Sequence, residues 1–303
     1  MAIQRELWQN TIVEGLFADN SFMSKAVNDD MYVNKGKKVH IPNAGAPSNV
    51  EVDRSSVPAT VKKRTDVDIE YTLNELTTDP ILIPYADTVE LSYSKRNSVI
   101  SQDRANLIEK AAEQMLYNWA PQSTQFVRTT GATKVVAHTE SATGNRKALV
   151  KADVAALMLK FNQQNIPQEG RYLLLDADMY AQLLNDLSEA DKWSFLQSAN
   201  MQKGILGQLY SFNIMMRSRV LRYATGGTLT KWGVSGAATD NAAGLAWHEG
   251  SLSRALGEVK MFDSTNNPTY YGDIYSFLVR CGGTIRRNDK KGVLALVQDA
   301  ADE

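Results

Sequence analysis

Residues 66–74 read D-V-D-I-E-Y-T-L-N and alternate between polar and apolar side chains without exception. The apolar residues of this stretch are Val67, Ile69, Tyr71 and Leu73. Successive side chains of a strand point to opposite sides, so these four residues would share one face of an extended chain. The pattern therefore predicts a β-strand that has one covered face and one face in water.

The residues before this strand predict a hairpin that projects from the body of the protein. Residues 37–42, K-K-V-H-I-P, read as a short strand that can pair with residues 66–74. Between the two strands, residues 43–64 contain two prolines and several small polar residues, a composition poorly suited to a compact core. About 20 residues is longer than an ordinary hairpin loop, and loops of such length are usually functional. We expect this hairpin to lie on another copy of the same chain.

Composition excludes several classes of protein. Of the 303 residues, 43% are hydrophobic and 22% are charged, a balance typical of globular proteins. The net charge of −1 argues against a dedicated nucleic-acid-binding protein, which usually carries a strongly basic face. No apolar run is long enough to cross a membrane, and residues 1–10 lack the apolar core of a signal peptide. We therefore expect no membrane partner. The single cysteine, Cys281, excludes an intrachain disulfide, which indicates synthesis in a reducing cytoplasm. Because Cys281 lies inside an apolar strand, we expect a buried, inert thiol.

Hydrophobic periodicity along the rest of the chain predicts a mixed α+β fold. Apolar residues spaced three, four and seven apart predict a long helix over residues 97–119. Residues 152–163 and 179–187 read as two further helices, the second preceded by a short strand at residues 172–175. Further β-like segments lie at residues 212–216, 245–248, 258–262, 274–280 and 293–297. We expect Gly282 and Gly283 to mark one of the last turns.

The sequence offers few of the patterns that carry enzyme chemistry. The three histidines lie far apart and there is one cysteine, so no zinc-type spacing exists and we expect no metal site. No glycine-rich phosphate loop is present, so we expect no cofactor. Asp176 and Asp178 form the best carboxylate pair, at a strand end where α/β enzymes often place catalytic groups. A structural role explains them better, with Asp178 as the N-cap of a helix that begins at Met179.

Three longer strings and their order carry a resemblance to a known family. Residues 71–84 read Y-T-L-N-E-L-T-T-D-P-I-L-I-P, and residues 98–120 hold the long helix, S-V-I-S-Q-D-R-A-N-L-I-E-K-A-A-E-Q-M-L-Y-N-W-A. The tail contains L-A-W-H-E-G-S-L-S-R-A-L-G-E-V-K-M-F and then Y-G-D-I-Y-S-F-L-V-R-C-G-G. This order of arm, hairpin, long helix, α/β insertion and returning strands resembles the major capsid protein of tailed bacteriophages, the Hong Kong 97 fold.

The resemblance implies a division of the chain into the parts of that fold. Residues 1–35 would form the N-terminal arm and residues 36–84 the extended E-loop hairpin. Residues 85–130 and 251–303 would form the P-domain with its spine helix. Residues 131–250 would form the inserted A-domain.

The resemblance also implies a structural role rather than an enzymatic one. Such a subunit would assemble as pentamers and hexamers into an icosahedral shell, in the host cytoplasm, and would remain in the virion. It would enclose double-stranded DNA by non-specific contact, with portal, decoration and separate scaffolding proteins as possible partners. No fused scaffolding segment is expected, and no partner asparagine can be matched for a lysine cross-link. The implied subunit contacts are made by the hairpin, the arm and the exposed face of the spine helix: Lys62, Lys63, Arg64, Trp8, Phe17, Arg104 and Glu113.

Two alternatives stay open at the level of sequence. The same fold would suit an encapsulin-like shell that stores a cargo enzyme, although no cargo-binding groove can be identified. An α/β hydrolase or transferase that uses Asp176 and Asp178 would instead form a small discrete oligomer and lose activity on Asp178→Asn.

Overall fold

The computed structural model describes residues 21–33, 37–45, 48–55, 57–59, 61, 63–85 and 94–301, with the backbone alone at residues 33, 94–102, 104, 108, 201 and 257–259. The α-helices are α2 (Asp30–Val33), α4 (Ser94–Trp119), α5 (Lys151–Gln163), α6 (Ala177–Asp186) and α7 (Glu189–Gln197). Short 3₁₀ turns lie at Ser21–Lys25, Ser123–Gln125, Met201–Lys203 and Glu249–Ser251. None of the helices in the described ranges is long and apolar enough to cross a membrane.

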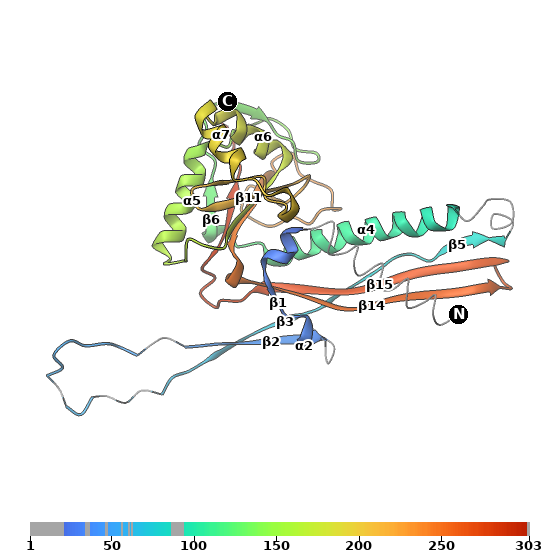
Figure 1. Ribbon diagram of the computed structural model, residues 1–303, viewed down its shortest axis with the longest axis horizontal. Coiled ribbons are helices and arrows are strands. Elements are labelled where there is room, and N and C mark those ends of the chain that lie inside the picture. The colour runs from blue at the N-terminus through green and yellow to red at the C-terminus, as the bar shows by residue number, and fades with distance from the viewer. Residues whose placement is uncertain are drawn as a thin grey trace.

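The strands fall into four sheets. They are β1 (Val27–Asn28), β2 (Lys38–Asn43), β3 (Val67–Thr72), β4 (Asn74–Thr77), β5 (Ile81–Pro84), β6 (Phe126–Arg128), β7 (Lys134–Val136), β8 (Asn145–Lys147), β9 (Arg171–Asp176), β10 (Gly207–Leu209), β11 (Phe212–Arg217), β12 (Leu221–Tyr223), β13 (Asn241–His248), β14 (Leu252–Asn267), β15 (Gly272–Ile285) and β16 (Val293–Val297). With 26% helix and 37% strand, the structure confirms the predicted α+β class. Figure 1 shows three parts: an α/β unit, a long helix beside a β-ribbon, and a hairpin that projects away from both.

The projecting hairpin is formed by β2 and β3, as the alternating stretch predicts. The two strands pair antiparallel, from Lys38 opposite Thr72 to Asn43 opposite Val67. The predicted face is covered only near the body: Tyr71 and Leu73 are buried with Val39, whereas Val67 is 43% exposed. The hydrophobic pattern thus continues past the point where the chain's own core ends.

The long helix α4 lies along a β-ribbon made by β14 and β15 (Figure 1). It begins three residues before the predicted start and ends at Trp119, the predicted end. The buried Trp119 indole donates a hydrogen bond from Nε1 to the carbonyl oxygen of Ser253, at 2.8 Å. Helix and ribbon share one core cluster, which also contains Phe277, Val279 and Cys281 of β15.

The ribbon strands are 16 and 14 residues long, much longer than the predicted segments. The prediction that Gly282 and Gly283 form a turn is wrong, because both lie inside β15. They are glycines because α4 and β3 approach the ribbon closely there. A Cβ on Gly283 would come within 2.6 Å of the Met115 sulfur, and one on Gly282 within 2.8 Å of the Leu73 side chain.

The α/β unit is built on a seven-stranded sheet in the order β10-β11-β9-β13-β16-β6, with β12 paired to β13. Alternate residues of its central strands enter two different cores. Leu173 and Leu175 of β9 pack with α5, α6 and α7, whereas Leu174 between them joins the core that contains α4. The sheet is therefore covered on both faces, and one of its faces fastens the unit to the long helix. The sequence predicted α5, α6, β9, β11, β13 and β16 of this unit. It missed α7 and the three-residue strands β6, β7, β8, β10 and β12.

Candidate assembly interface

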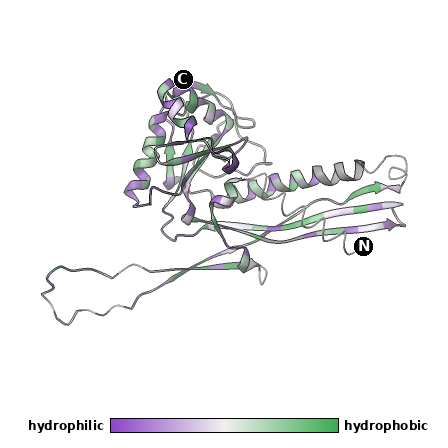
Figure 2. Ribbon diagram, viewed as in Figure 1, coloured by the Kyte–Doolittle hydropathy of each residue, from purple (hydrophilic) through white to green (hydrophobic). Residues whose placement is uncertain are grey.

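The loop that joins β2 to β3 carries apolar side chains that nothing in the described chain covers. Beyond the Asn43–Val67 pair the two arms separate and run far from the body (Figure 1). Four valines there are almost fully exposed: Val50 at 89%, Val52 at 85%, Val57 at 84% and Val61 at 95%. Figure 2 shows hydrophobic residues interspersed with hydrophilic ones along this hairpin. Exposed apolar residues gathered on a projecting segment mark a surface that a partner covers.

The basic run on the same loop is only partly available to a partner. Lys62 lies outside the described residues, and Lys63 is exposed. Arg64 already has a partner in its own loop, because its Nε donates to Asp66 Oδ1 at 2.6 Å. The pKa of Asp66 lies below its usual value because the Gly45 backbone N–H and the Arg64 guanidinium both stabilise the carboxylate. The valines are therefore stronger candidates for a partner contact than the basic residues. They were not among the contact residues expected from the sequence.

A buried polar cluster holds the base of the hairpin against the body. Asp29 is 3% exposed and accepts hydrogen bonds from Arg286 Nη1 at 2.9 Å and from the Tyr71 hydroxyl at 3.4 Å. Asn43 of β2 donates to the Arg286 carbonyl oxygen at 2.7 Å. Burial, followed by the charge of Asp29, raises the pKa of Tyr71 well above its ordinary value, so its hydroxyl stays a donor. These contacts set the direction in which the hairpin leaves the body.

The other predicted contact residues are distributed differently. Trp8 and Phe17 lie outside the described residues, and Arg104 is described only as backbone within α4. The placement of Glu113 on an exposed face of the helix is wrong, because this residue is only 8% exposed. Residues 220–232 lie over that face, and together with α4 they line a partly open cavity of about 110 Å³, to which Leu76 also contributes. No periodicity within the helix could reveal a cover that comes from more than 100 residues later.

Inside that cavity Glu113 has one satisfied oxygen and one unsatisfied oxygen. Its Oε2 accepts from Lys110 Nζ at 2.8 Å, whereas Oε1 has no hydrogen-bond partner among the described residues. A nearby cation, Lys231, lies 4.5 Å from the centre of the Tyr117 ring. The cavity thus belongs to the junction between α4 and the α/β unit rather than to a free helix surface.

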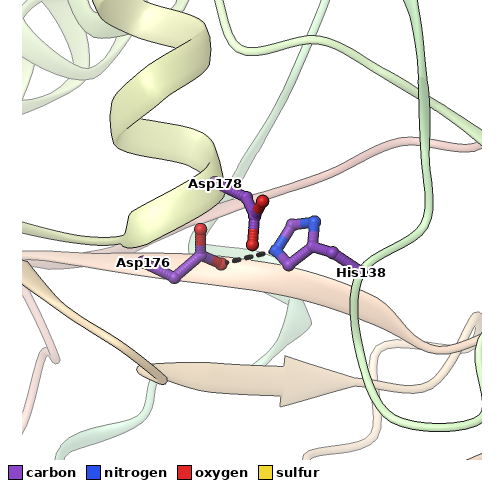
Figure 3. Close-up of side chains that lie close together, drawn as sticks. All are labelled: His138, Asp176 and Asp178. Atoms are coloured by element: carbon purple, nitrogen blue, oxygen red, sulfur yellow. Dashed lines mark hydrogen bonds and ion pairs between the residues drawn. The ribbon is translucent and has the colours of Figure 1, made fainter.

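The carboxylate pair singled out in the sequence meets a histidine in the structure (Figure 3). Asp176, not Asp178, caps α6: the helix begins at Ala177, and Asp176 Oδ1 accepts from the Met179 backbone N–H at 2.7 Å. The predicted cap was therefore two residues late, because β9 runs directly into the helix without a separating loop. His138 Nε2 lies 2.9 Å from Asp176 Oδ2. No pattern in the sequence indicates this contact, because His138 lies 38 residues earlier, between β7 and β8.

The electrostatics of this cluster favour the protonated form of the His138 imidazole, and no nucleophile contacts it among the described residues. Burial is the largest influence and lowers the pKa of His138, but the hydrogen bond and charge of Asp176 and the charge of Asp178 outweigh it. The pKa of His138 therefore lies above its usual value. A histidine–aspartate pair can activate a hydroxyl or thiol nucleophile that it contacts. Among the described residues His138 Nδ1 is buried and has no hydrogen-bond partner, so no nucleophile is joined to the pair.

Comparison with known proteins places the fold. A scan against models of known families finds no match, and a search of curated proteins finds none either. Among solved structures, 149 chains match. The capsid of Ralstonia phage GP4 has a TM-score of 0.63 at 12% identity, over 92% of this chain and 88% of the other. The capsid of cyanophage P-SCSP1u has a TM-score of 0.59 at 15% identity, over 92% and 87%.

A virus-like particle also matches. The virus-like particle from Pyrococcus furiosus has a TM-score of 0.55 at 11% identity, over 97% of this chain and 99% of that chain. All of these matches span nearly the whole length of both chains, so the likeness concerns the complete architecture rather than one shared unit. The chain has the fold of tailed-bacteriophage capsid proteins.

Proposed function

We propose that this chain is the major capsid protein of a tailed phage, which assembles as pentamers and hexamers into an icosahedral shell around double-stranded DNA. The observation that carries the proposal is the projecting hairpin with its four exposed valines, on a chain that has the capsid fold. A closed shell needs repeated heterologous contacts that close on themselves, and a long hairpin supplies one such contact to a neighbour. Because many subunits are joined, each individual contact can be weak.

The parts of the proposed subunit follow from the same fold. Residues 36–84 would act as the E-loop, residues 85–130 and 251–303 as the P-domain, and residues 131–250 as the A-domain. The arm at residues 1–35 would lie on neighbouring subunits. The protein would assemble in the host cytoplasm and stay in the virion, with portal, scaffolding and decoration proteins as further partners. It would contact DNA non-specifically and would not act as an enzyme.

A second candidate is a nanocompartment shell of the encapsulin type. It is favoured by the match to the Pyrococcus furiosus virus-like particle, which extends over 97% of this chain. The contents of the particle distinguish the two roles. Nuclease-protected double-stranded DNA in particles from the native source would support the phage head, and a protein cargo without DNA would support the nanocompartment.

The assembly itself is tested by negative-stain electron microscopy and sedimentation velocity on the purified chain. The expected result is closed shells, or rings of five and six subunits. A matched variant replaces residues 46–64 with a short Gly/Ser turn and keeps the paired part of the hairpin. This variant is expected to stay folded and to lose the shells. A wild-type chain that remains a monomer or dimer at high concentration, with or without a co-expressed scaffolding protein, would contradict the proposal.

A further inference from the structure

Three metal-ligating side chains converge at the start of α6 and serve no role in the proposed shell contact (Figure 3). They are His138, Asp176 and Asp178, and one ligand atom from each lies within 4.8 Å of the others. Asp176 is 5% exposed, and the His138 side chain is 18% exposed. Asp178 is exposed, so the group is a mixed nitrogen and oxygen donor set that is open to solvent on one side, drawn from two separate segments of the α/β unit.

The geometry points to a site for a single transition-metal dication, with His138, Asp176 and Asp178 as its protein ligands. One imidazole nitrogen and two carboxylate oxygens suit Zn²⁺ and its first-row neighbours, whereas Ca²⁺ and Mg²⁺ prefer oxygen ligands alone. Three protein ligands leave positions for water, as in sites that are not closed structural centres. Ligands of a tetrahedral zinc lie about 3.4 Å apart, so small side-chain movements would bring the three ligand atoms, which lie within 4.8 Å of one another, to that spacing.

Asp176 is oriented for this role by its own hydrogen bond. Its Oδ1 accepts from the Met179 backbone N–H, which fixes the carboxylate and leaves Oδ2 directed at His138. Outer contacts of this kind hold metal ligands in place before the ion arrives. A metal bound to Oδ2 would therefore replace only the contact with His138 and would keep the helix cap.

Within the described chain the two carboxylates are compensated only in part, by the imidazole of His138. Asp178 makes no hydrogen bond or ion pair there, and neither aspartate is paired with a lysine or arginine. Arg146, whose charge acts on His138, directs its Nη atoms to four backbone carbonyl oxygens instead. The N-terminus of α6 contributes only about half a positive charge. The two carboxylates outweigh these contributions, and a dication that displaces the proton of His138 would neutralise them.

A bound ion would join the segment between β7 and β8 to the start of α6. His138 lies in that segment, whose flanking strands β7 and β8 pair with each other in a separate two-stranded sheet and meet the rest of the unit through contacts that include a bridge from Arg146 to Ala300. The ion would thus act as a fastener within the α/β unit. It would stabilise the folded subunit, because a ligand that binds only the native state shifts the unfolding equilibrium.

The test is a calorimetric titration of the EDTA-treated full chain with ZnCl₂, repeated on variants. Wild type is expected to bind one Zn²⁺ per chain and to unfold at a higher temperature when loaded. His138→Gln and Asp178→Asn are each expected to weaken binding by about tenfold or more, since even outer-shell changes have effects of that size. Asp178→Asn removes no hydrogen bond, so its apo form is expected to melt like wild type.

Two control variants change the same kinds of residue, a histidine and an acid, at positions outside the His138 cluster. His40→Gln removes a histidine that lies 2.7 Å from a single aspartate, Asp68, on the exposed hairpin. Glu189→Gln removes an acid from the first turn of the neighbouring helix α7. Both are expected to bind Zn²⁺ as wild type does. The site would be refuted by a wild type that binds no Zn²⁺, or by binding that survives His138→Gln and Asp178→Asn.

Discussion

At the scale of single residues, the close approach of α4 to the β-ribbon depends on the absence of a side chain. Gly283 faces Met115 and Trp119 of the helix, and a Cβ there would lie 2.6 Å from atoms of both. Trp119 cannot move aside easily, because its indole is fully buried and hydrogen-bonded to Ser253. The glycine therefore sets the distance between α4 and the β-ribbon.

Gly283→Ala is expected to destabilise the subunit by about 1–3 kcal/mol, the usual range for overpacking a core. The measurement is urea unfolding of the dissociated subunit, followed by tryptophan fluorescence. Gly226→Ala is the matched control, because a Cβ there would meet nothing within 4 Å and its backbone lies outside the left-handed region. The control should change stability by less than about 0.5 kcal/mol. Equal unfolding midpoints for the two variants would show that the contact is not tight.

Residue-level predictions from the sequence succeeded where the cause is local. The prediction of a buried thiol for Cys281 is confirmed: the residue is 1% exposed, and burial raises its pKa to about 12. Predictions that depend on distant segments were wrong or missing. Glu113 is covered by residues 220–232, and His138 meets Asp176 only through the fold.

At the scale of elements, the β2–β3 hairpin was predictable, because a strand with one covered face requires alternating polar and apolar residues. The ribbon of β14 and β15 was predicted only in part, over residues 258–262 and 274–280, because polar residues and paired glycines interrupt its hydrophobic pattern without interrupting the strands. Its backbone hydrogen bonds and its packing against α4 are tertiary features that strand propensity does not report. The helix α7 was missed, although Ser188 caps it by accepting from the Asp191 backbone N–H.

The exposed loop of the hairpin gives a prediction at this scale. The double variant Val50→Thr, Val52→Thr keeps side-chain shape but adds hydroxyl groups that are unfavourable to bury. Each valine that a neighbour covers contributes on the order of 1 kcal/mol. The critical subunit concentration for assembly is therefore expected to rise about tenfold or more, as measured by sedimentation velocity.

The control for this variant is a second pair of exposed valines outside the hairpin. Val136 and Val234 are 75% and 55% exposed and belong to the α/β unit. Val136→Thr, Val234→Thr should leave assembly unchanged if the hairpin alone makes the contact. Both double variants should unfold like wild type, because none of the four residues is buried in the subunit. A similar loss of assembly in both would assign no special role to the hairpin.

At the scale of the whole molecule, the isolated subunit leaves apolar surface uncovered. Its described residues form three hydrophobic core clusters, yet the hairpin extends well beyond them and carries apolar residues into water (Figure 1). The Asp29–Arg286 cluster holds the base of the hairpin against the body, so the loop has a fixed direction in which to meet a neighbour. The fold and the exposed loop together favour a shell in which each subunit covers part of the next.

The most direct test is a cryo-electron microscopy reconstruction of the assembled particle, with attention to residues 44–66. We predict that this loop lies on an adjacent subunit and that the neighbour covers Val50, Val52, Val57 and Val61. This prediction would be contradicted by a shell in which the loop stands away from every neighbour with its valines still in solvent.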